Sequence, residues 1–559
     1  MASLHASARF LYRNHHVFYR CQNNFELPTK IVLSNDKCKK SLYTNNVRFS
    51  WTKRKINNEW KGNNILKSSG VILALLTVGL SVYYINDKKR RVYLKAAESN
   101  AGAFNPKLPS HTLKEVAKHN SKKDRVWVTF DQGVYDITDF IDQHPGGGEK
   151  IMMAAGGSVE PFWMMYGIHK TPKILALLEQ YRIGNLSVED AKIATSNMDD
   201  PYSNEPQRHP ALNTSSLRPY NAEPPSALLV DSFITPTALF YVRNHLPVPD
   251  VDEKSYELEI SGVGVKTTTL TLEDIKKFPK HSVTACIQCA GNRRSEMNQV
   301  KLVKGLEWGP AAIGNATWSG TRLYDVLTSL GLKEDDPRVR HIQFEGMDTD
   351  VTNVPYGASI PVEKGMDPRG DVLLAYEMNG EPLTRDHGFP IRVIVPGTVG
   401  ARNVKWLGSI VVAEEESSSH WQQNDYKGFS PSVDWHNVDF KTAVAIQELP
   451  VTSVIGEPAS GASVRVDKGR IKLKGYAFSG GGHQVVRVDV TADKGQSWHT
   501  AQLIQEPTRP PRHWGWTLWT ADIPVDPKAS QLEFWVKAVD NSYNTQPESF
   551  SHIWNLRGV

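Results

Sequence analysis

Two cysteines three residues apart, Cys286 and Cys289, are the side chains of this sequence best suited to chemistry. Cys289 is followed within five residues by Arg293 and Arg294. Nearby cations favour the ionised form of a thiol, so a reactive thiolate is expected at Cys289. A thiolate of this kind suits metal ligation, nucleophilic attack or redox chemistry.

The cysteine count narrows these alternatives. Cys21 and Cys38 lie in the N-terminal leader, which leaves one cysteine pair for a body of more than 450 residues and excludes a disulfide-stapled scaffold. A structural zinc site normally needs two further nitrogen or sulfur ligands, and the sequence has no second Cys-x-x-Cys. A buried, inert pair of cysteines remains the plain structural alternative.

Arginines placed beside aromatic residues recur in four short motifs. These are Phe-Tyr-Val-Arg-Asn-His at 240–245, His-Gly-Phe-Pro-Ile-Arg at 387–392, Gly-Thr-Val-Gly-Ala-Arg-Asn-Val-Lys at 397–405 and Trp-Asn-Leu-Arg-Gly-Val at 554–559. Any one of these arginines is ordinary at a surface. Their co-occurrence in an otherwise acidic body predicts a pocket for an anion.

A second candidate site involves two histidines. His144 begins a His-Pro-Gly-Gly-Gly turn, and His169 follows 25 residues later. The residues between them are apolar and helical in pattern, so they are able to line a cofactor slot. A lone His-Pro is usually a plain turn, but the preceding strand and the second histidine favour a cofactor site.

Charge is distributed unevenly along the 559 residues. Residues 1–100 carry 18 Lys and Arg against 5 Asp and Glu, so the rest carries 47 basic and 55 acidic residues. The acidic body argues against nucleic acid binding. The basic leader ends in an apolar run at 71–85, which predicts an organelle-targeting presequence with a sorting segment or a retained membrane anchor.

The body divides into four segments. A compact α+β domain that contains both histidines is expected at 108–187, with strands at 126–128 and 134–137, and a Pro-rich flexible hinge at 188–225. A mixed α+β domain is expected at 226–430. Residues 431–559, with strands at 463–466, 485–490 and 532–539, predict an antiparallel β-sandwich of immunoglobulin-like type.

The histidine motif resembles the cytochrome b5 family, and the arginine motifs together with Cys-Ala-Gly-Asn-Arg-Arg at 289–294 resemble the sulfite oxidase family. The match covers about residues 105–559 in the family's domain order of haem, molybdopterin and dimerisation domains. With the leader, the chain is similar to the animal mitochondrial members. The resemblance implies a homodimer in the mitochondrial intermembrane space that meets the membrane only transiently or through a retained N-terminal segment.

The resemblance also assigns roles to individual residues. Cys289 is the implied molybdenum ligand, and His144 and His169 are the implied haem iron ligands. The implied contacts of the molybdopterin cofactor are Phe240, Tyr241, Val242, Arg243, Asn244, Cys289, Asp348, His387, Arg392, Asn403, Val404 and Lys405. The implied residues that bind substrate are Arg243, Arg294, Trp308, Tyr426 and Arg557, of which Arg243, Arg294 and Tyr426 also have catalytic roles with Cys289.

The implied activity is molybdenum-dependent oxidation of sulfite to sulfate, the terminal step of sulfur amino-acid degradation. The oxygen atom comes from water, and two electrons pass through haem b to cytochrome c. Two rival functions fit the sequence less well. An assimilatory nitrate reductase places its haem domain after the molybdenum domain, unlike this order. A membrane-anchored haem carrier would leave Cys289 and its arginines without a purpose.

Overall fold

The computed structural model describes residues 101–195 and 200–558. The leader, with the expected presequence and the apolar run at 71–85, lies outside these residues. Within the described ranges, no helix has the length and apolar character that crossing a bilayer requires.

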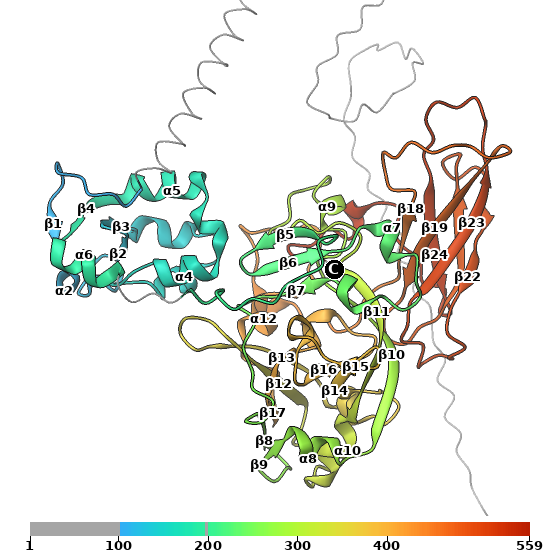
Figure 1. Cartoon of the computed structure of the whole chain (residues 1–559), viewed down its shortest axis with the longest axis horizontal. Helices are drawn as coiled ribbons and strands as arrows, with labels where there is room; N and C mark the ends of the chain where they lie inside the picture. The colour runs from blue at the N-terminus through green and yellow to red at the C-terminus, as the bar shows by residue number, and fades with distance from the viewer. Residues whose placement is uncertain (1–100, 196–199, 559) are drawn as a thin grey trace, which may run out of the picture. The chain divides into compact units, whose positions relative to one another are not determined.

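The part that carries the two histidines is built on a four-stranded sheet in the order β1-β4-β3-β2 (Figure 1). Its strands are β1 (Ser110–His111), β2 (Trp127–Phe130), β3 (Gly133–Asp136) and β4 (Arg182–Leu186). Its helices are α2 (Leu113–Val116), α3 (Gly148–Met152), α4 (Glu160–Met165), α5 (Pro172–Leu178) and α6 (Val188–Thr195). The strands expected at 126–128 and 134–137 are confirmed as β2 and β3, with ends moved by one or two residues.

Local sequence explains where the histidines are held. A 3-10 helix, Thr138–Gln143, ends at His144, and Gly147 then takes a φ of +96°, a conformation that favours glycine. A second 3-10 helix, Gly167–Lys170, carries His169 between α4 and α5. The two histidines therefore stand on short turns at helix ends, which regular structure on both sides fixes in place.

The central part contains two five-stranded sheets and a smaller one. The first sheet follows the order β10-β11-β14-β15 with β16 paired to β14, the second β13-β12-β17-β8-β9, and the third β5-β6-β7. The strands are β5 (Asn213–Leu217), β6 (Tyr220–Glu223), β7 (Val242–Arg243), β8 (Glu257–Gly262), β9 (Thr268–Thr271), β10 (Lys280–Gln288), β11 (Ile313–Arg322), β12 (His341–Thr349), β13 (Pro355–Pro361), β14 (Leu373–Met378), β15 (Glu381–Pro382), β16 (Arg392–Ile394) and β17 (Leu407–Ala413). The helices are short: α7 (Ser226–Leu229), α8 (Leu272–Lys276), α9 (Arg294–Met297), α10 (Leu323–Ser329), α11 (Val362–Met366) and α12 (His420–Gln423). Residues 188–225, for which a hinge is expected, hold α6, β5 and β6.

The C-terminal part is a sandwich of two antiparallel sheets, β18-β19-β23-β22 and β21-β20-β24. The strands are β18 (Thr452–Glu457), β19 (Arg470–Phe478), β20 (Val485–Thr491), β21 (His499–Thr500), β22 (Gln502–Ile504), β23 (Thr517–Pro524) and β24 (Trp535–Asp540). The expected strands at 485–490 and 532–539 are confirmed as β20 and β24. The strand expected at 463–466 is wrong, because that segment is exposed and pairs with no neighbouring strand before β19 begins.

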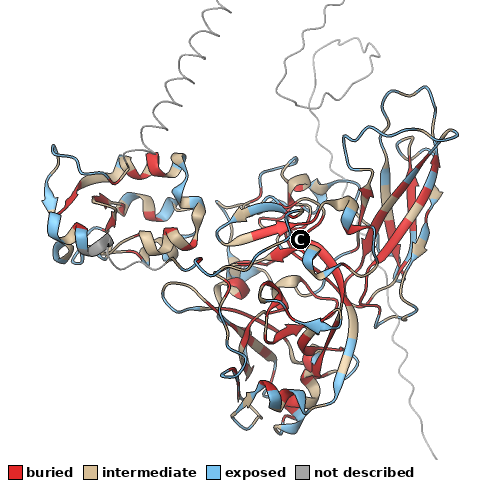
Figure 2. Cartoon of the chain, in the orientation of Figure 1, coloured by how far each residue is buried: buried red, intermediate tan, exposed pale blue. Residues whose placement is uncertain are grey.

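Buried residues follow the strands of the central and C-terminal sheets (Figure 2). Tyr476 and Trp516 of the sandwich belong to the same apolar cluster as Phe344 and Ile410 of the central part. A separate cluster that contains Val488 and Trp519 fills the sandwich itself. Because the central part and the sandwich share a core, the sandwich is able to hold elements of the central site in place.

Candidate active site

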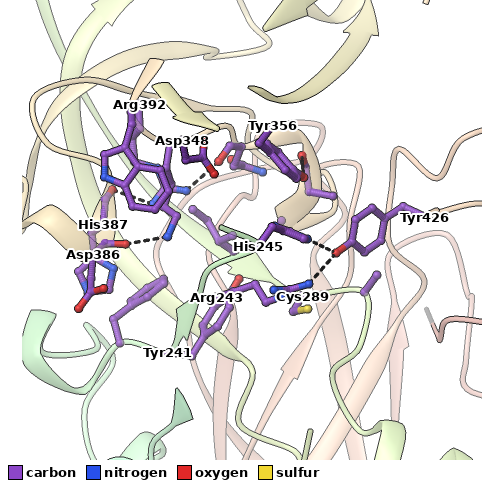
Figure 3. Close-up of a pocket in the computed structure, with 18 residues that line it drawn as sticks. Tyr241, Arg243, His245, Cys289, Asp348, Tyr356, Asp386, His387, Arg392 and Tyr426 are labelled. Carbon is purple, nitrogen blue, oxygen red and sulfur yellow. Dashed lines mark hydrogen bonds between the residues drawn. The ribbon is translucent and has the colours of Figure 1, made fainter. Parts of the chain in front are cut away.

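One pocket in the central part collects most of the residues expected from the sequence (Figure 3). Its lining includes ten of them: Phe240, Tyr241, Arg243, Cys289, Asp348, His387, Arg392, Asn403, Lys405 and Tyr426. They come from the ends of strands and from the turns between them. Segments almost 190 residues apart in sequence thus converge on one cavity.

Cys289 enters this pocket from a tight turn after β10. Its backbone N–H donates to the carbonyl of Ala312 at 3.0 Å, and its carbonyl accepts from Asn292 N–H at 3.0 Å. The N–H of Gly291 points at the Cys289 sulfur, at 3.4 Å. A Cβ at Gly291 would stand 2.7 Å from Arg294 and Trp308, so only glycine fits this turn without a shift.

The two cysteines face different surroundings. Cys286 packs in the main apolar cluster, and Cys289 packs in a separate cluster with Tyr241 and Trp308. Both are free thiols. In the described ranges, no group of three or more His, Cys, Asp and Glu side chains is placed to hold a metal. A zinc site built on both cysteines is therefore not formed in this part of the chain.

Arg243 supplies positive charge beside the thiol. Its guanidinium donates to the Asn221 side chain at 3.2 Å and to the Tyr426 hydroxyl at 3.4 Å. Arg243 has no carboxylate ion-pair partner among the described residues. A partly buried cation without a countercharge is costly alone, and it is stabilised when an anion binds next to it.

Tyr426 joins Arg243 to His245 (Figure 3). The Tyr426 oxygen accepts a hydrogen bond from Arg243. The hydroxyl hydrogen of Tyr426 is therefore directed to Nε2 of His245, at 2.6 Å. Burial and the Arg243 charge hold the pKa of His245 well below its usual range, so this imidazole is neutral and accepts. Tyr426 also has a φ of +24°, an uncommon strained backbone conformation of the kind that gathers at functional sites.

Arg294, Trp308 and Arg557 lie around the pocket and not in its lining. Arg294 is buried and donates to backbone carbonyls, to Leu306 at 2.7 Å and to Arg557 at 3.1 Å. Trp308 is fully buried against the Cys289 cluster. Arg557 forms a bidentate ion pair with Asp425, the residue before Tyr426. In this arrangement Arg294 positions the backbone that carries Arg557.

The remaining expected cofactor residues also fall into two groups. Val242 and Val404 point into apolar clusters. Asn244 supports the pocket wall from behind, because its side chain contacts Lys405 and Asp386. Such backing residues fix the orientation of groups that do reach the cavity.

The far end of the pocket holds buried polar groups suited to an anionic cofactor. Arg392 donates to the carbonyls of His387 and Asn403, both at 3.0 Å, while its Nε has no partner in the described chain. Asp348 Oδ1 is likewise buried without a partner there. Burial lowers the pKa of Lys405 to about 7 and raises that of Asp348 to about 8. Unpaired buried donors and acceptors call for a ligand, and this donor set fits the phosphate and ring heteroatoms of a pterin cofactor.

Several lining residues were not expected from the sequence, among them His245, Tyr356 and Asp386. His245 stacks on Tyr356 with ring centroids 4.5 Å apart. Asp386 pairs with Arg208 at 2.8 Å and accepts from Asn244 at 3.3 Å. His245 is the last residue of the 240–245 motif and Asp386 directly precedes the 387–392 motif, so the sequence carries a signal for both. Tyr356 stands on β13, in a stretch that no motif marks.

The histidines form a second site on the N-terminal sheet. The rings of His144 and His169 lie 6.2 Å apart between centroids with an angle of 12° between their planes. Nδ1 of His144 bonds to the Gly147 carbonyl at 2.9 Å, and Nδ1 of His169 to the Tyr166 carbonyl at 3.0 Å. These bonds fix the tautomer and leave Nε2 of each ring free for a metal, which fits a haem iron held between them.

Comparison with known families agrees with these two sites. Three family models match the chain: Cytochrome b5-like Heme/Steroid binding domain at 112–187, Oxidoreductase molybdopterin binding domain at 245–421 and Mo-co oxidoreductase dimerisation domain at 443–559. The domain order is the one expected from the motifs. A haem carrier with a C-terminal region that serves only for partner binding does not account for the molybdopterin match.

Similar proteins extend this result over most of the chain. "Sulfite oxidase, mitochondrial" of Drosophila melanogaster is 57% identical over 86% of this chain and 86% of its own length. "Sulfite oxidase" of Gallus gallus is 52% identical over 81% of this chain and 98% of its own length. "Sulfite oxidase, mitochondrial" of Homo sapiens is 52% identical over 80% of this chain and 82% of its own length. Among solved structures, the sulfane dehydrogenase SoxCD of Paracoccus pantotrophus is 26% identical, with a TM-score of 0.52 over 66% of this chain and 92% of that one.

The nitrate reductase alternative has a weaker match. "Nitrate reductase [NADH] 2" of Phaseolus vulgaris is 39% identical over 62% of this chain, and the match covers only 41% of that protein. The sulfite oxidases are both more similar and matched over most of their length. With a molybdopterin-binding domain around Cys289, a haem-binding domain before it and a dimerisation domain after it, the chain belongs to the sulfite oxidase family.

Proposed function

We propose that this chain oxidises sulfite to sulfate at the Cys289 pocket and passes the electrons through haem to cytochrome c. One observation carries the proposal: Cys289 lies close to arginines that have no carboxylate partner among the described residues. Arg243 donates only to neutral groups, and Arg294 only to backbone carbonyls. This local positive charge contrasts with a body that is acidic overall.

Sulfite fits this electrostatic setting. It is a small dianion with three oxygen acceptors, and its desolvation costs several kcal/mol unless cations and hydrogen-bond donors replace the water. Arg243 offers a charged donor beside the sulfur of Cys289. Tyr426 offers a hydroxyl on the same side. The same donors stabilise the sulfate product, whose charge is equal.

When bound through Cys289, the molybdenum of the pterin cofactor supplies the oxygen transfer and accepts an electron pair. Sulfite and water yield sulfate, two protons and two electrons, so the pocket has to release protons as well. Burial raises the pKa of Tyr426, which keeps its hydroxyl protonated as a hydrogen-bond donor. Its hydrogen is directed to Nε2 of neutral His245 at 2.6 Å, which holds the hydroxyl in place beside Arg243.

The haem site supplies the exit for electrons, which a hydrolase would not need. His144 and His169 would hold the haem iron from both sides, and two protein ligands suit an iron to electron transfer and not to oxygen binding. Because a haem carries one electron at a time, each turnover would reduce two molecules of a one-electron acceptor.

Three finer features belong to the same proposal. Cytochrome c is the proposed acceptor, because an acidic body attracts a basic partner with a strength that salt weakens. The mitochondrial intermembrane space is the proposed location, in line with the basic leader and with relatives named as mitochondrial. The Pro-rich segment 188–225 is the proposed hinge that lets the haem domain approach the molybdenum and then leave it.

A sulfite-dependent cytochrome c reduction assay on Cys289→Ser, with molybdenum and haem measured in the same protein, tests the proposal. We expect loss of molybdenum and activity with haem retained. Cys286→Ser is the matched control, because that thiol lies on β10, three residues before Cys289, and faces another cluster. Full activity in Cys289→Ser would sink the assignment.

The hinge has its own test. Deleting residues 196–199 of this segment, which leaves β5, β6 and the Arg208–Asp386 pair intact, should slow sulfite-driven haem reduction while leaving sulfite oxidation by a small artificial acceptor unchanged. If both rates fall together, the segment does not act as a hinge.

A further inference from the structure

The turn that presents Cys289 is bridged from the C-terminal sandwich by one tyrosine. Tyr476 of β19 is fully buried, and its hydroxyl reaches into the central part. The hydroxyl donates to the carbonyl of Pro310 at 2.8 Å and accepts from the Asn292 side-chain amide at 2.9 Å. Asn292 lies three residues after Cys289, and Pro310 lies two residues before Ala312, which accepts from the Cys289 N–H.

The direction of every bond in this bridge is determined. A proline carbonyl only accepts, so the Tyr476 hydroxyl must donate to Pro310. Its lone pair is then left for the Asn292 amide nitrogen. With that nitrogen engaged, Asn292 Oδ1 faces the backbone N–H of Ala312 at 3.1 Å. A single side-chain hydroxyl therefore sets which way the Asn292 amide points.

Asn292 in turn closes the Cys289 turn. Its backbone N–H donates to the Cys289 carbonyl at 3.0 Å, and within that turn the Gly291 N–H points at the sulfur at 3.4 Å. An N–H bond to a thiolate ligand withdraws electron density from the sulfur. For metal–thiolate centres, such bonds tune the reduction potential and hold the ligand in place.

We propose that Tyr476 is a positioning residue for the molybdenum ligand, acting through Asn292 on the Gly291 N–H bond to Cys289. This proposal rests on the proposed function of the Cys289 site. The sandwich thereby serves catalysis in addition to dimerisation. A second contact supports the role, since Arg293 of the same turn takes a φ of +64° and donates to the Ser453 carbonyl of β18 at 3.0 Å.

Tyr476→Phe tests the proposal, with Tyr256→Phe as matched control. Tyr256 belongs to the same apolar cluster, is 2% exposed and donates one hydroxyl bond to the Leu407 carbonyl at 2.6 Å, but has no bond to the Cys289 turn. Both variants lose a buried phenol hydroxyl. Any effect common to both is therefore general destabilisation and not positioning.

The expected result separates the two variants. Tyr476→Phe should lower kcat about tenfold, the low end of the 10- to 100-fold loss found when groups behind a metal ligand are removed, with KM for sulfite unchanged. The midpoint potential of the molybdenum should move to more negative values, and that of the haem should not move. Tyr256→Phe should leave kcat, KM and both potentials at wild-type values.

A second variant, Asn292→Asp, keeps the acceptor for Ala312 and removes the donor to Tyr476. It should shift the molybdenum potential in the same direction as Tyr476→Phe. The double variant should show no larger loss of kcat and no larger shift of potential than the stronger single variant, because both substitutions act through one bridge. Equal potentials and equal kcat in Tyr476→Phe and Tyr256→Phe would overturn the inference, as would additive effects in the double variant. Wild-type protein that binds no molybdenum and lacks sulfite activity would instead overturn the proposed function.

Discussion

Arg557, near the C-terminal end of the sandwich, pairs with the carboxylate of Asp425 through two nitrogen–oxygen contacts, Nε to Oδ1 at 2.6 Å and Nη2 to Oδ2 at 2.5 Å. Asp425 is 2% exposed and immediately precedes Tyr426. The pair thus connects the end of the C-terminal domain to a residue of the pocket. It also neutralises the Arg557 charge, whereas Arg243, Arg294 and Arg392 have no carboxylate partner among the described residues.

The Asp425–Arg557 pair makes stability depend on pH. Burial raises the pKa of Asp425, but the Arg557 charge outweighs burial and holds that pKa at about 2. Because the pKa of Asp425 is lower in the folded chain than in the unfolded chain, where it is near 4, its ionisation stabilises the fold at every pH above about 4. This contribution, about 2 kcal/mol, is lost as pH falls from about 4 to about 2. We expect Asp425→Asn to unfold at lower urea than wild type at pH 6. The difference should shrink below pH 4, and a constant difference from pH 6 to pH 3 would contradict this account.

Arg243 should act mainly by binding the substrate anion and by stabilising the negative charge of the transition state. Arg243→Gln removes a charged hydrogen bond worth about 1.5–3 kcal/mol, so kcat/KM for sulfite should fall about 10- to 100-fold. Arg338→Gln is the control, because Arg338 is exposed and pairs locally with Asp336. Steady-state kinetics at several salt concentrations check the prediction. It fails if both variants change kcat/KM to the same extent.

Tyr426 should assist the chemistry more than the binding of substrate. Tyr426→Phe removes the hydroxyl that lies between Arg243 and His245, so kcat should fall by about 100-fold, as for the loss of one donor to a reacting group. The fold should survive, since phenylalanine fills nearly the same volume. Single-turnover reduction by sulfite and thermal unfolding of the same sample test this. An unchanged reduction rate would show that the hydroxyl is not used.

His245 should remain neutral throughout the working range. Burial and the Arg243 charge lower its pKa well below 6.5, so the protonated form appears only in acid. We therefore expect no inflection near pH 6.5 from this residue in kcat/KM plotted against pH. An inflection there that disappears in His245→Gln would show that the imidazole titrates and that its pKa is not depressed.

The two cofactor sites should be separable. His169→Ala removes one of the two rings that face each other at 6.2 Å, so the protein should lose haem and keep molybdenum. Cytochrome c reduction should stop, while oxidation of sulfite by ferricyanide continues at the wild-type rate. His119→Ala, on the same domain and stacked on Trp127, should keep both activities. Loss of molybdenum along with haem in His169→Ala would show that the sites depend on each other.

Part of the site could be predicted from sequence because its residues lie in continuous motifs. The His-Pro-Gly-Gly turn, the Cys289 motif and the arginine motifs each carry their chemistry within four to nine neighbouring residues. The chain order of haem, molybdopterin and sandwich domains was predictable for the same reason. The wrong strand at 463–466 came from an alternating pattern that no neighbouring strand pairs with.

Pairings between distant residues were not predictable, because they depend on which strand ends meet in space. Nothing in sequence links Asp425 to Arg557, Tyr426 to His245 or Tyr476 to Asn292. Arg294 was expected to bind substrate, yet the structure directs it to backbone carbonyls. Sequence alone determined that this protein has a cysteine followed closely by arginines and two histidines set up as candidate ligands. Only the tertiary structure decided which cations stay unbalanced and which residues hold the thiolate, because long-range packing sets burial, charge balance and hydrogen-bond direction.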